Sequence, residues 1–189
     1  RNLTLIHNEV TDLGTGGEPI NTGRIQSANS TVARTDVGHP LASFYGYVTD
    51  GIFQTPEEVA NHAFQAEGTA PGDIRFKDLN NDGVIDINDR TYIGNPIPKM
   101  TYGITGNLAY KGIDLTMFWQ GSYGNDIYNG SVRYDFTYVN RPKSTLERWT
   151  GPGTSNSQPR VGLSDPDQNA RVSDRFVEDG SNIRLINVQ

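Results

Sequence analysis

Residues 101–123, TYGITGNLAYKGIDLTMFWQGSY, decide the fold because apolar and polar side chains alternate along them with a period of two. The apolar positions are Tyr102, Ile104, Gly106, Leu108 and Tyr110 in the first half, and Ile113, Leu115, Met117, Trp119, Gly121 and Tyr123 in the second. Alternation over this length is typical of β-strands with one apolar face. Lys111 and Gly112 separate the two halves and predict a tight reversal, so the stretch predicts an antiparallel hairpin.

The length of each arm fits two environments. About ten residues let a tilted strand cross a bilayer. Aromatic residues stand near the strand ends, where the girdles of membrane barrels lie; they are Tyr102, Tyr110, Trp119 and Tyr123. A soluble β-sandwich would give the same alternation, so the pattern alone leaves both a membrane barrel and a soluble sandwich open.

The composition indicates a β-rich chain and argues against several kinds of partner. Only 34% of the 189 residues are hydrophobic and 21 are glycines, which suits turns and short strands. The absence of cysteine excludes disulfides and a thiolate zinc site. A net charge of −6 without a cluster of Lys or Arg predicts that nucleic acid is not a partner. No apolar run approaches the roughly 18 residues of a membrane-spanning helix, and residues 1–4 lack the features of a signal peptide.

A second stretch, residues 78–89 (DLNNDGVIDIND), has the spacing of a calcium-binding loop. Gly83 at position six can adopt the positive φ that turns the chain, so that a backbone carbonyl points inward at position seven. Positions one, three, five, nine and twelve carry side-chain oxygens. We therefore predict a calcium site whose ligands are Asp78, Asn80, Asp82, the carbonyl of Val84, Asp86 and Asp89.

Two alternatives to a calcium site remain open. Asp89 closes the loop where a Glu is usual, and its shorter side chain weakens discrimination against magnesium, which is the alternative ion. Residues 80–83 are also a common turn sequence, because Asn-Gly and Asp-Gly pairs form hairpins readily. A simple turn explains Asp82 and Gly83, but it does not explain acidic groups at both ends of the twelve-residue window.

One short helix is predicted between the aromatic residues near position 50 and the metal loop. Thr55 can cap it, Pro56 suits its first position, Glu58 completes a capping box and Gly68 can end it. Residues 73–77, which precede the metal loop, alternate like a strand.

The sequence gives no sign of a catalytic site. His7, His39 and His62 have no second His or Cys at metal-binding spacing, so we assign them surface or packing roles. No nucleophile, base and orienting group occur together, and we expect that the chain is not an enzyme.

These patterns divide the chain into five segments. They are a strand end and polar loop over residues 1–37, a loop region with the helix and metal loop over 38–98, a transmembrane-type hairpin over 99–124, a long outer loop over 125–176, and the start of a further strand over 177–189. Residues 12–29 are expected to be loop, and residues 182–189 to be a strand cut off without a partner. The long outer loop offers aromatic faces at Tyr128, Tyr134, Phe136, Tyr138 and Trp149.

Several short motifs run in order along most of the chain. Beside the metal loop, they are Gly38-His39-Pro40, Phe44-Tyr45-Gly46-Tyr47, Asp50-Gly51-Ile52-Phe53, Pro71-Gly72-Asp73-Ile74, Ile93-Gly94-Asn95-Pro96, Tyr102-Gly103 and Val177-Glu178-Asp179-Gly180-Ser181. Together they resemble the late barrel region of SusC/RagA-type TonB-dependent outer-membrane transporters. This resemblance favours the barrel over the soluble sandwich.

The resemblance implies a mostly β fold, with antiparallel strands of a transmembrane β-barrel, long outer loops, one short helix and the calcium-type loop. It implies import of oligosaccharides or peptides across the cell outer membrane of Bacteroidetes-like bacteria. The implied partners are outer-membrane lipid, a SusD-like surface lipoprotein that closes over the barrel, and the TonB complex, which acts through a plug that these residues do not include. Further barrel strands are expected before Arg1 and after Gln189.

Two other classes of protein use some of the same features. A soluble calcium-stapled carbohydrate-binding module would use the same loop and aromatic residues, and it would fold without detergent. A secreted hydrolase would need paired carboxylates that face a cleft, and Asp50, Asp114 and Asp126 have no spacing that argues for such a pair.

Overall fold

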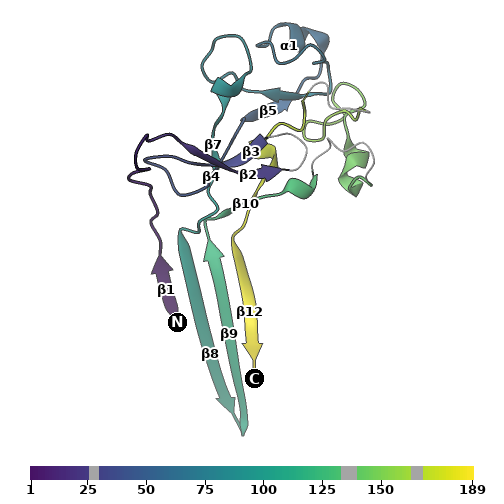
Figure 1. Ribbon diagram of the computed structural model, residues 1–189. Helices are drawn as coiled ribbons and strands as arrows, with labels where there is room; N and C mark the ends of the chain where they lie inside the picture. Colours follow the sequence, from purple (N-terminus) through teal and green to yellow (C-terminus); the bar gives the residue numbers. More distant parts are fainter. Residues whose placement is uncertain (26–29, 133–139, 163–167) are drawn as a thin grey trace.

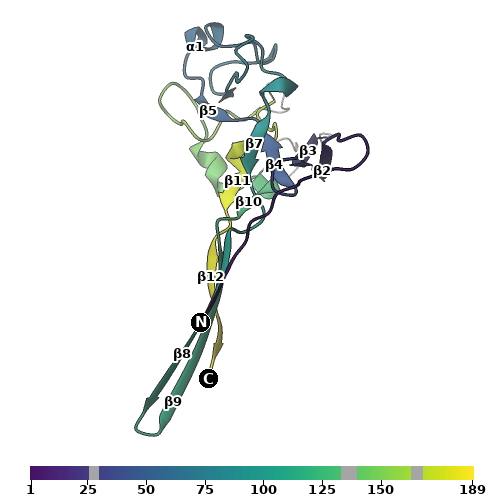
Figure 2. The ribbon, with the colours of Figure 1, turned by 90° about the vertical axis from the view of Figure 1, so that its left-hand side faces the viewer.

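A long antiparallel sheet projects from a head of short strands and loops in the computed structural model (Figure 1), which describes residues 1–25, 30–132, 140–162 and 168–189. The sheet contains β1 (Asn2–Leu5), β8 (Met100–Tyr110), β9 (Ile113–Tyr123) and β12 (Asn182–Val188), in the order β1-β8-β9-β12. Seen from the side, it is thin and extends away from the other elements (Figure 2). Segments from both ends and the middle of the chain therefore pair in one sheet.

The predicted hairpin over residues 101–123 is confirmed. β8 and β9 are each eleven residues long and pair without a shift from Met100 opposite Tyr123 to Tyr110 opposite Ile113. The turn residues Lys111 and Gly112 have φ angles of 48° and 83°. Positive φ at both central positions is the turn geometry that matches the right-handed twist of paired strands.

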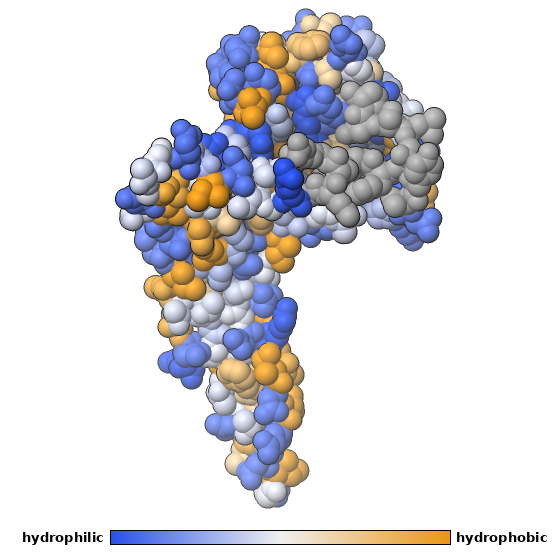
Figure 3. All heavy atoms as spheres, viewed as in Figure 1, coloured by the Kyte–Doolittle hydropathy of each residue, from blue (hydrophilic) through white to orange (hydrophobic). Residues whose placement is uncertain are grey.

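The register of the sheet places its apolar side chains on one face. Apolar pairs across the strands are Leu3 with Tyr102, Ile104 with Trp119, Leu108 with Leu115, and Trp119 with Leu185. Leu108 is 62% exposed and Ile113 is 71% exposed, and Figure 3 shows hydrophobic residues near the free end of this sheet, interspersed with hydrophilic ones. A contiguous apolar surface of this kind marks a contact with membrane or protein.

The end of the chain is paired, so the expectation of a strand without a partner is wrong. β12 pairs with β9, and the register shifts between Leu185 and Asn187. Because side chains alternate along a strand, the shift returns Val188 to the face that carries Leu185 and leaves Asn187 on the other face. β12 therefore continues both faces of the hairpin.

The described part of the head contains three small antiparallel sheets. The largest contains β2 (Ile20–Ile25), β3 (Ser30–Thr35), β4 (Ser43–Gly46) and β7 (Thr91–Gly94). The other two pair β5 (Thr49–Ile52) with β6 (Ile74–Phe76), and β10 (Asp126–Tyr128) with β11 (Val177–Asp179). The strand predicted over residues 73–77 is confirmed as β6.

The expectation of a loop over residues 12–29 is wrong for β2. This strand has the sequence INTGRI, which lacks an apolar alternation. It forms because it pairs with β3, from Ile20 opposite Thr35 to Ile25 opposite Ser30. Pairing with a distant partner strand overrides a weak local preference.

The predicted helix is present but is shorter than expected. α1 (Pro56–Ala60) is capped by Thr55, whose side-chain oxygen accepts from the backbone N–H of Glu58. It ends at Asn61 instead of Gly68, because Phe64 leaves the helix to pair with the metal loop: Phe64 N donates to Gly83 O, and Ile85 N donates to Phe64 O. No helix in the described residues is long and apolar enough to cross a membrane.

The segment expected to be a long outer loop packs back on the head. In addition to β10, it holds the 3₁₀ turns η2 (Gly130–Val132), η3 (Lys143–Glu147) and η4 (Asp174–Phe176). Trp149 packs against a core cluster of Ile52, Ile74, Phe76 and Ile85. The predicted aromatic positions Tyr134, Phe136 and Tyr138 lie outside the described residues.

A buried ion pair joins three segments of the head. Asp73 is fully buried and accepts hydrogen bonds from Arg160 Nε at 2.6 Å and Nη2 at 2.9 Å. Asn169 Nδ2 also donates to Asp73, while Asn169 Oδ1 accepts from the backbone N–H of Ile74. Residues 160 and 169 are thereby fixed against β6.

Labels on the two faces of the hairpin should distinguish lipid from water. In the full-length protein, an environment-sensitive fluorophore attached to Ile104→Cys or Leu115→Cys is expected to report hydrocarbon, because both side chains lie on the apolar face. Thr105→Cys and Thr116→Cys, on the opposite face, are the matched controls and should report water. Labels that report water at Ile104 and Leu115 would contradict a membrane position for the hairpin.

Candidate functional site

The predicted metal loop connects β6 to β7 at the end of the head away from the long sheet (Figure 1). Its first ligand position, Asp78, accepts hydrogen bonds from Asn81 N at 2.7 Å and from Gly83 N at 2.9 Å. Asn81 and Gly83 have φ angles of 60° and 85°, which turn the chain around this carboxylate. Gly83 has no atom within 4 Å of an added Cβ, so its backbone conformation, and not crowding, favours glycine here.

The middle of the loop is ordered by short-range hydrogen bonds. Asp82 N donates to Asn80 Oδ1 at 3.0 Å, and Asn80 Nδ2 donates to Asp82 Oδ2 at 2.8 Å. Val84 N donates to Asp82 Oδ1 at 2.9 Å. Val84 also forms an isolated bridge with Phe64, which holds position seven of the loop against the segment that follows α1.

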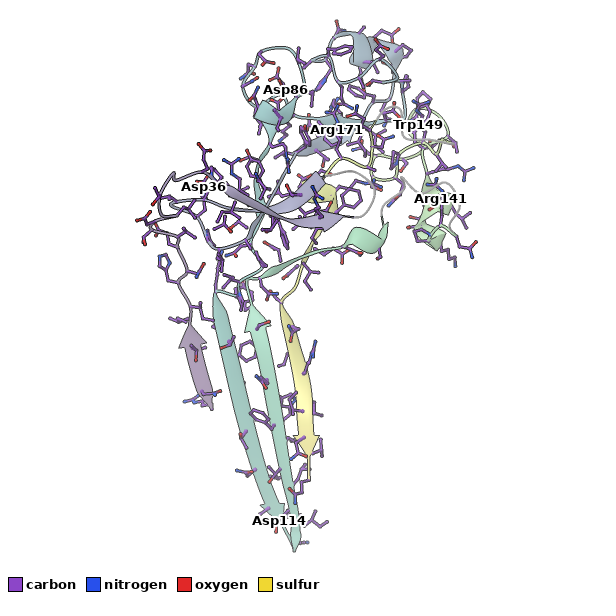
Figure 4. All side chains as sticks on the ribbon, viewed as in Figure 1. Asp36, Asp86, Asp114, Arg141, Trp149 and Arg171 are labelled. Carbon is purple, nitrogen blue, oxygen red and sulfur yellow. The ribbon has the colours of Figure 1, made fainter. Side chains whose placement is uncertain are left out.

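The end of the loop is a capped 3₁₀ turn, η1 (Ile87–Asp89). Asp86, labelled in Figure 4, caps this turn and accepts from Asn88 N at 2.7 Å. Asp89 is fully buried; its two oxygens accept from Leu79 N and Asp86 N, each at 2.8 Å. Asp89 therefore closes the loop by accepting from the backbone near its start, at Leu79, and before its final turn, at Asp86.

The structure brings the six predicted ligands into one loop but does not converge their carboxylates. Within the described ranges, no group of three or more His, Cys, Asp or Glu side chains is close enough to hold a metal ion. The donor set is nevertheless all oxygen, which suits a hard cation. None of the described ion pairs of Lys or Arg involves a carboxylate of this loop.

Arg171 binds backbone carbonyls of the loop and of the segment that follows α1, and the sequence patterns did not identify this residue. Its guanidinium donates to Ile85 O at 3.3 Å and Gln65 O at 2.9 Å and lies 5.1 Å from the centre of the Tyr47 ring. Figure 4 labels Arg171 and Asp86 on neighbouring parts of the head. No local pattern identifies this arginine, because it lies 86 residues after Ile85 in the chain.

Charges beside the loop act on two half-buried groups. Burial raises the pKa of Tyr47; Arg171 and Arg90 act to lower it, whereas Asp86 and Asp89 raise it further. Burial lowers the pKa of Arg90, which donates to Thr31 O and Tyr45 O. The loop thus lies next to a region in which positive and negative charges are close together.

Histidines and aromatic residues of the head have packing roles. His39 stacks on Tyr92 with ring centres 3.6 Å apart, and His62 meets the buried Phe53 edge-on. Tyr92 donates to Asp36 at 3.2 Å. Burial, with a contribution from Asp36, raises the pKa of Tyr92 to about 12. The assignment of His39 and His62 to packing roles is confirmed.

No protein-family model matches the chain. TonB-dependent receptor P26 of Formosa agariphila is 30% identical over 187 residues, which cover 96% of this chain and 18% of that protein. TonB-dependent receptor SusC of Bacteroides thetaiotaomicron is 29% identical over 194 residues, which cover 99% of this chain and 17% of that protein. The chain therefore spans less than a fifth of the length of these curated relatives.

A solved structure shares the fold. The structure of the RagAB peptide transporter aligns with a TM-score of 0.66 and 19% sequence identity, covering 95% of this chain and 19% of that chain. At this identity, the match carries information on the fold alone. The alignment covers both the long sheet and the head, so the larger protein contains both parts of this fold.

Replacement of Asp89 should open the loop even without a metal. Asp89→Ala leaves the partly buried N–H groups of Leu79 and Asp86 without their acceptor, and a hydrogen bond to a charged group contributes about 1.5–3 kcal/mol. In buffer containing a chelator, we expect faster hydrogen exchange over residues 78–89. Asp82→Ala, which affects the exposed Val84 N–H, is the control and should change exchange less; equal effects would contradict a structural role for Asp89.

Proposed function

This chain belongs to the SusC/RagA-type TonB-dependent transporters, and we propose that it forms part of the barrel wall and outer loops of a nutrient importer. The observation that carries the proposal is the register of the long sheet. It separates an exposed apolar face from a polar face over four strands, as expected for a wall between lipid and an aqueous lumen. A soluble carbohydrate-binding module is not favoured, because it would bury the apolar face.

In this proposal, the long sheet lies in the outer membrane and the head lies outside it. The longer protein supplies the remaining strands and the plug through which TonB delivers energy. A SusD-like surface lipoprotein closes over the barrel, and the cargo is an oligosaccharide or a peptide; the solved structure that shares the fold is itself named as a peptide transporter. The relatives are named as receptors, not enzymes, and the chain takes part in no bond-making step.

Loss of the full-length protein should abolish uptake of a nutrient class. A deletion strain is expected to lose uptake of a defined oligosaccharide mixture or a defined peptide mixture, and a plasmid copy should restore it. A copy with Ile104→Arg and Met117→Arg, which lie on the apolar face near the middle of β8 and β9, should fail, because a lipid-facing Arg near the middle of the bilayer costs about 2–4 kcal/mol.

Asn107→Arg, on the polar face of β8, is the matched control for this experiment. It should assemble in the outer membrane as the unmodified protein does. Unchanged uptake of both mixtures by the deletion strain would overturn the proposed function.

We propose that residues 78–89 bind calcium, with magnesium as the alternative ion. The support is the all-oxygen ligand spacing and the positive φ of Gly83. In addition, the four carboxylates of the loop repel one another unless a cation neutralises them. The ion would make the outer part of the head rigid, and it would act as a structural staple instead of a catalyst.

Chelation should weaken the metal loop of the full-length protein. We expect EDTA to raise protease cleavage within residues 78–89 and calcium to reverse the effect; magnesium tests the alternative ion. Asp78→Ala combined with Asp82→Ala should abolish the response, because it removes two ligands. Glu9→Ala with Glu18→Ala removes two carboxylates elsewhere and should leave the response intact; a response that persists in the Asp78 and Asp82 variant would exclude this site.

A further inference from the structure

The polar face of the long sheet is hollowed next to the head. A cavity of about 340 Å³ lies there, and its lining comes from three adjacent strands. Thr101 comes from β8, Gln120 and Ser122 from β9, and Asn182 and Arg184 from β12. The cavity therefore lies on the polar face of the sheet, where Ile186, at the register shift of β12, is its one large apolar lining residue.

The register explains why a hollow forms at this level. Thr101, Ser122 and Asn182 lie opposite one another across β8, β9 and β12, and their short side chains leave space. One level further from the head, Gln120 lies opposite Arg184, so two longer side chains border the space.

Some polar side chains of the cavity form hydrogen bonds within the described chain, and others do not. Asn182 Nδ2 donates to Ser122 Oγ at 2.9 Å, and Ser122 Oγ donates to Asn125 Oδ1 at 3.1 Å. The side chains of Gln120 and Arg184 make no hydrogen bond to another residue that the structure describes. They therefore retain donors for a ligand in the cavity.

Arg184 makes this part of the wall positive. The other charged residue on the described polar face, Asp114, lies at the hairpin turn, six residues from Gln120 along β9. This separation is about 20 Å, more than twice the Debye length of about 8 Å at physiological ionic strength, so Asp114 does not neutralise Arg184.

The chemistry of Arg184 suits an anion. A guanidinium has a planar set of N–H donors that matches the oxygens of a carboxylate or sulfate.

We propose that this cavity is a subsite for an anionic group of the transported solute, with Arg184 as its charged contact and Gln120 as a hydrogen-bond donor. The proposal rests on the import function, because the polar face borders the path of the solute only in a barrel wall. The shared chemistry is a carboxylate or sulfate. An acidic peptide and an acidic oligosaccharide are its two sources.

Two pairs of probes separate these sources in the full-length transporter. One pair is an acetylated and amidated pentapeptide with a central glutamate, and the same peptide with glutamine. The other is trigalacturonate and its neutral methyl ester. Calorimetry gives the dissociation constant of each probe, and uptake by cells is measured in parallel.

The anionic member of one pair should bind about tenfold more tightly than its neutral counterpart, as expected for one charge-assisted contact. Arg184→Gln should remove this preference without changing the affinity for the neutral probe. Arg184→Lys should retain part of it. Arg24→Gln, which removes a positive charge from β2 in the head, is the matched control and should leave the preference intact.

The absence of a preference in both pairs, or a preference that survives Arg184→Gln, would overturn the subsite. If the preference survives Arg184→Gln and this variant also has a lower melting temperature, Arg184 would instead belong to an ion pair within the longer protein. Equal uptake of both members of a pair by cells would support import and overturn the subsite. Preferential binding without uptake of any probe would support the subsite and contradict the import function.

Discussion

The uninterrupted pairing of β8 with β9 is the constraint on which the other features depend. Every residue from Met100 to Tyr110 has a partner across the hairpin. In hydrocarbon, an unpaired backbone N–H or C=O costs several kcal/mol, so only a fully paired strand is stable there. A slip of one residue would exchange the two faces: Ile104 and Leu108 would move to the polar face and Asn107 to the apolar face. The same register therefore fixes both the exposed apolar face and the polar face that holds Arg184.

Polar contacts join segments of the head that are far apart in the chain. Its main apolar cluster contains four buried residues, Ile52, Ile74, Phe76 and Ile85. Asp73 and Arg160 join segments that lie 87 residues apart in the chain, and removal of Arg160 would take the cationic partner from the fully buried carboxylate of Asp73. Asn156 adds a similar link, because its side-chain oxygen accepts from Ile52 N. Long loops are held in place here by specific hydrogen bonds more than by a large core.

The parts of the fold that could be predicted are those encoded over short distances. Alternation in residues 101–123 is a local signal, and it predicts both the strands and the face that each side chain occupies. The limits of α1 and the existence of β2 could not be predicted, because they depend on partners far away: Phe64 pairs with the metal loop, and β2 pairs with β3. In the candidate metal site, the spacing predicts a set of ligand positions, but it carries no information on Arg171, which contacts the loop from a distant segment.

Hydrogen bonds at the junction between the long sheet and the head hold the two parts in a fixed relation. Hydrogen bonds continue beyond the ends of the strands: Ile6 N donates to Lys99 O at 2.9 Å, and Lys99 N donates to Tyr123 O at 3.0 Å. On the other side, Asp126 N donates to Asn95 O, and Asn95 N donates to the carboxylate of Asp126, both at 2.7 Å. Because these bonds leave little freedom at the points where the chain passes from sheet to head, the head keeps a fixed orientation above the wall. The cavity beside Arg184 and the loop over residues 78–89 then belong to one rigid frame, in which the hydrogen bonds of the junction link the sheet to the head.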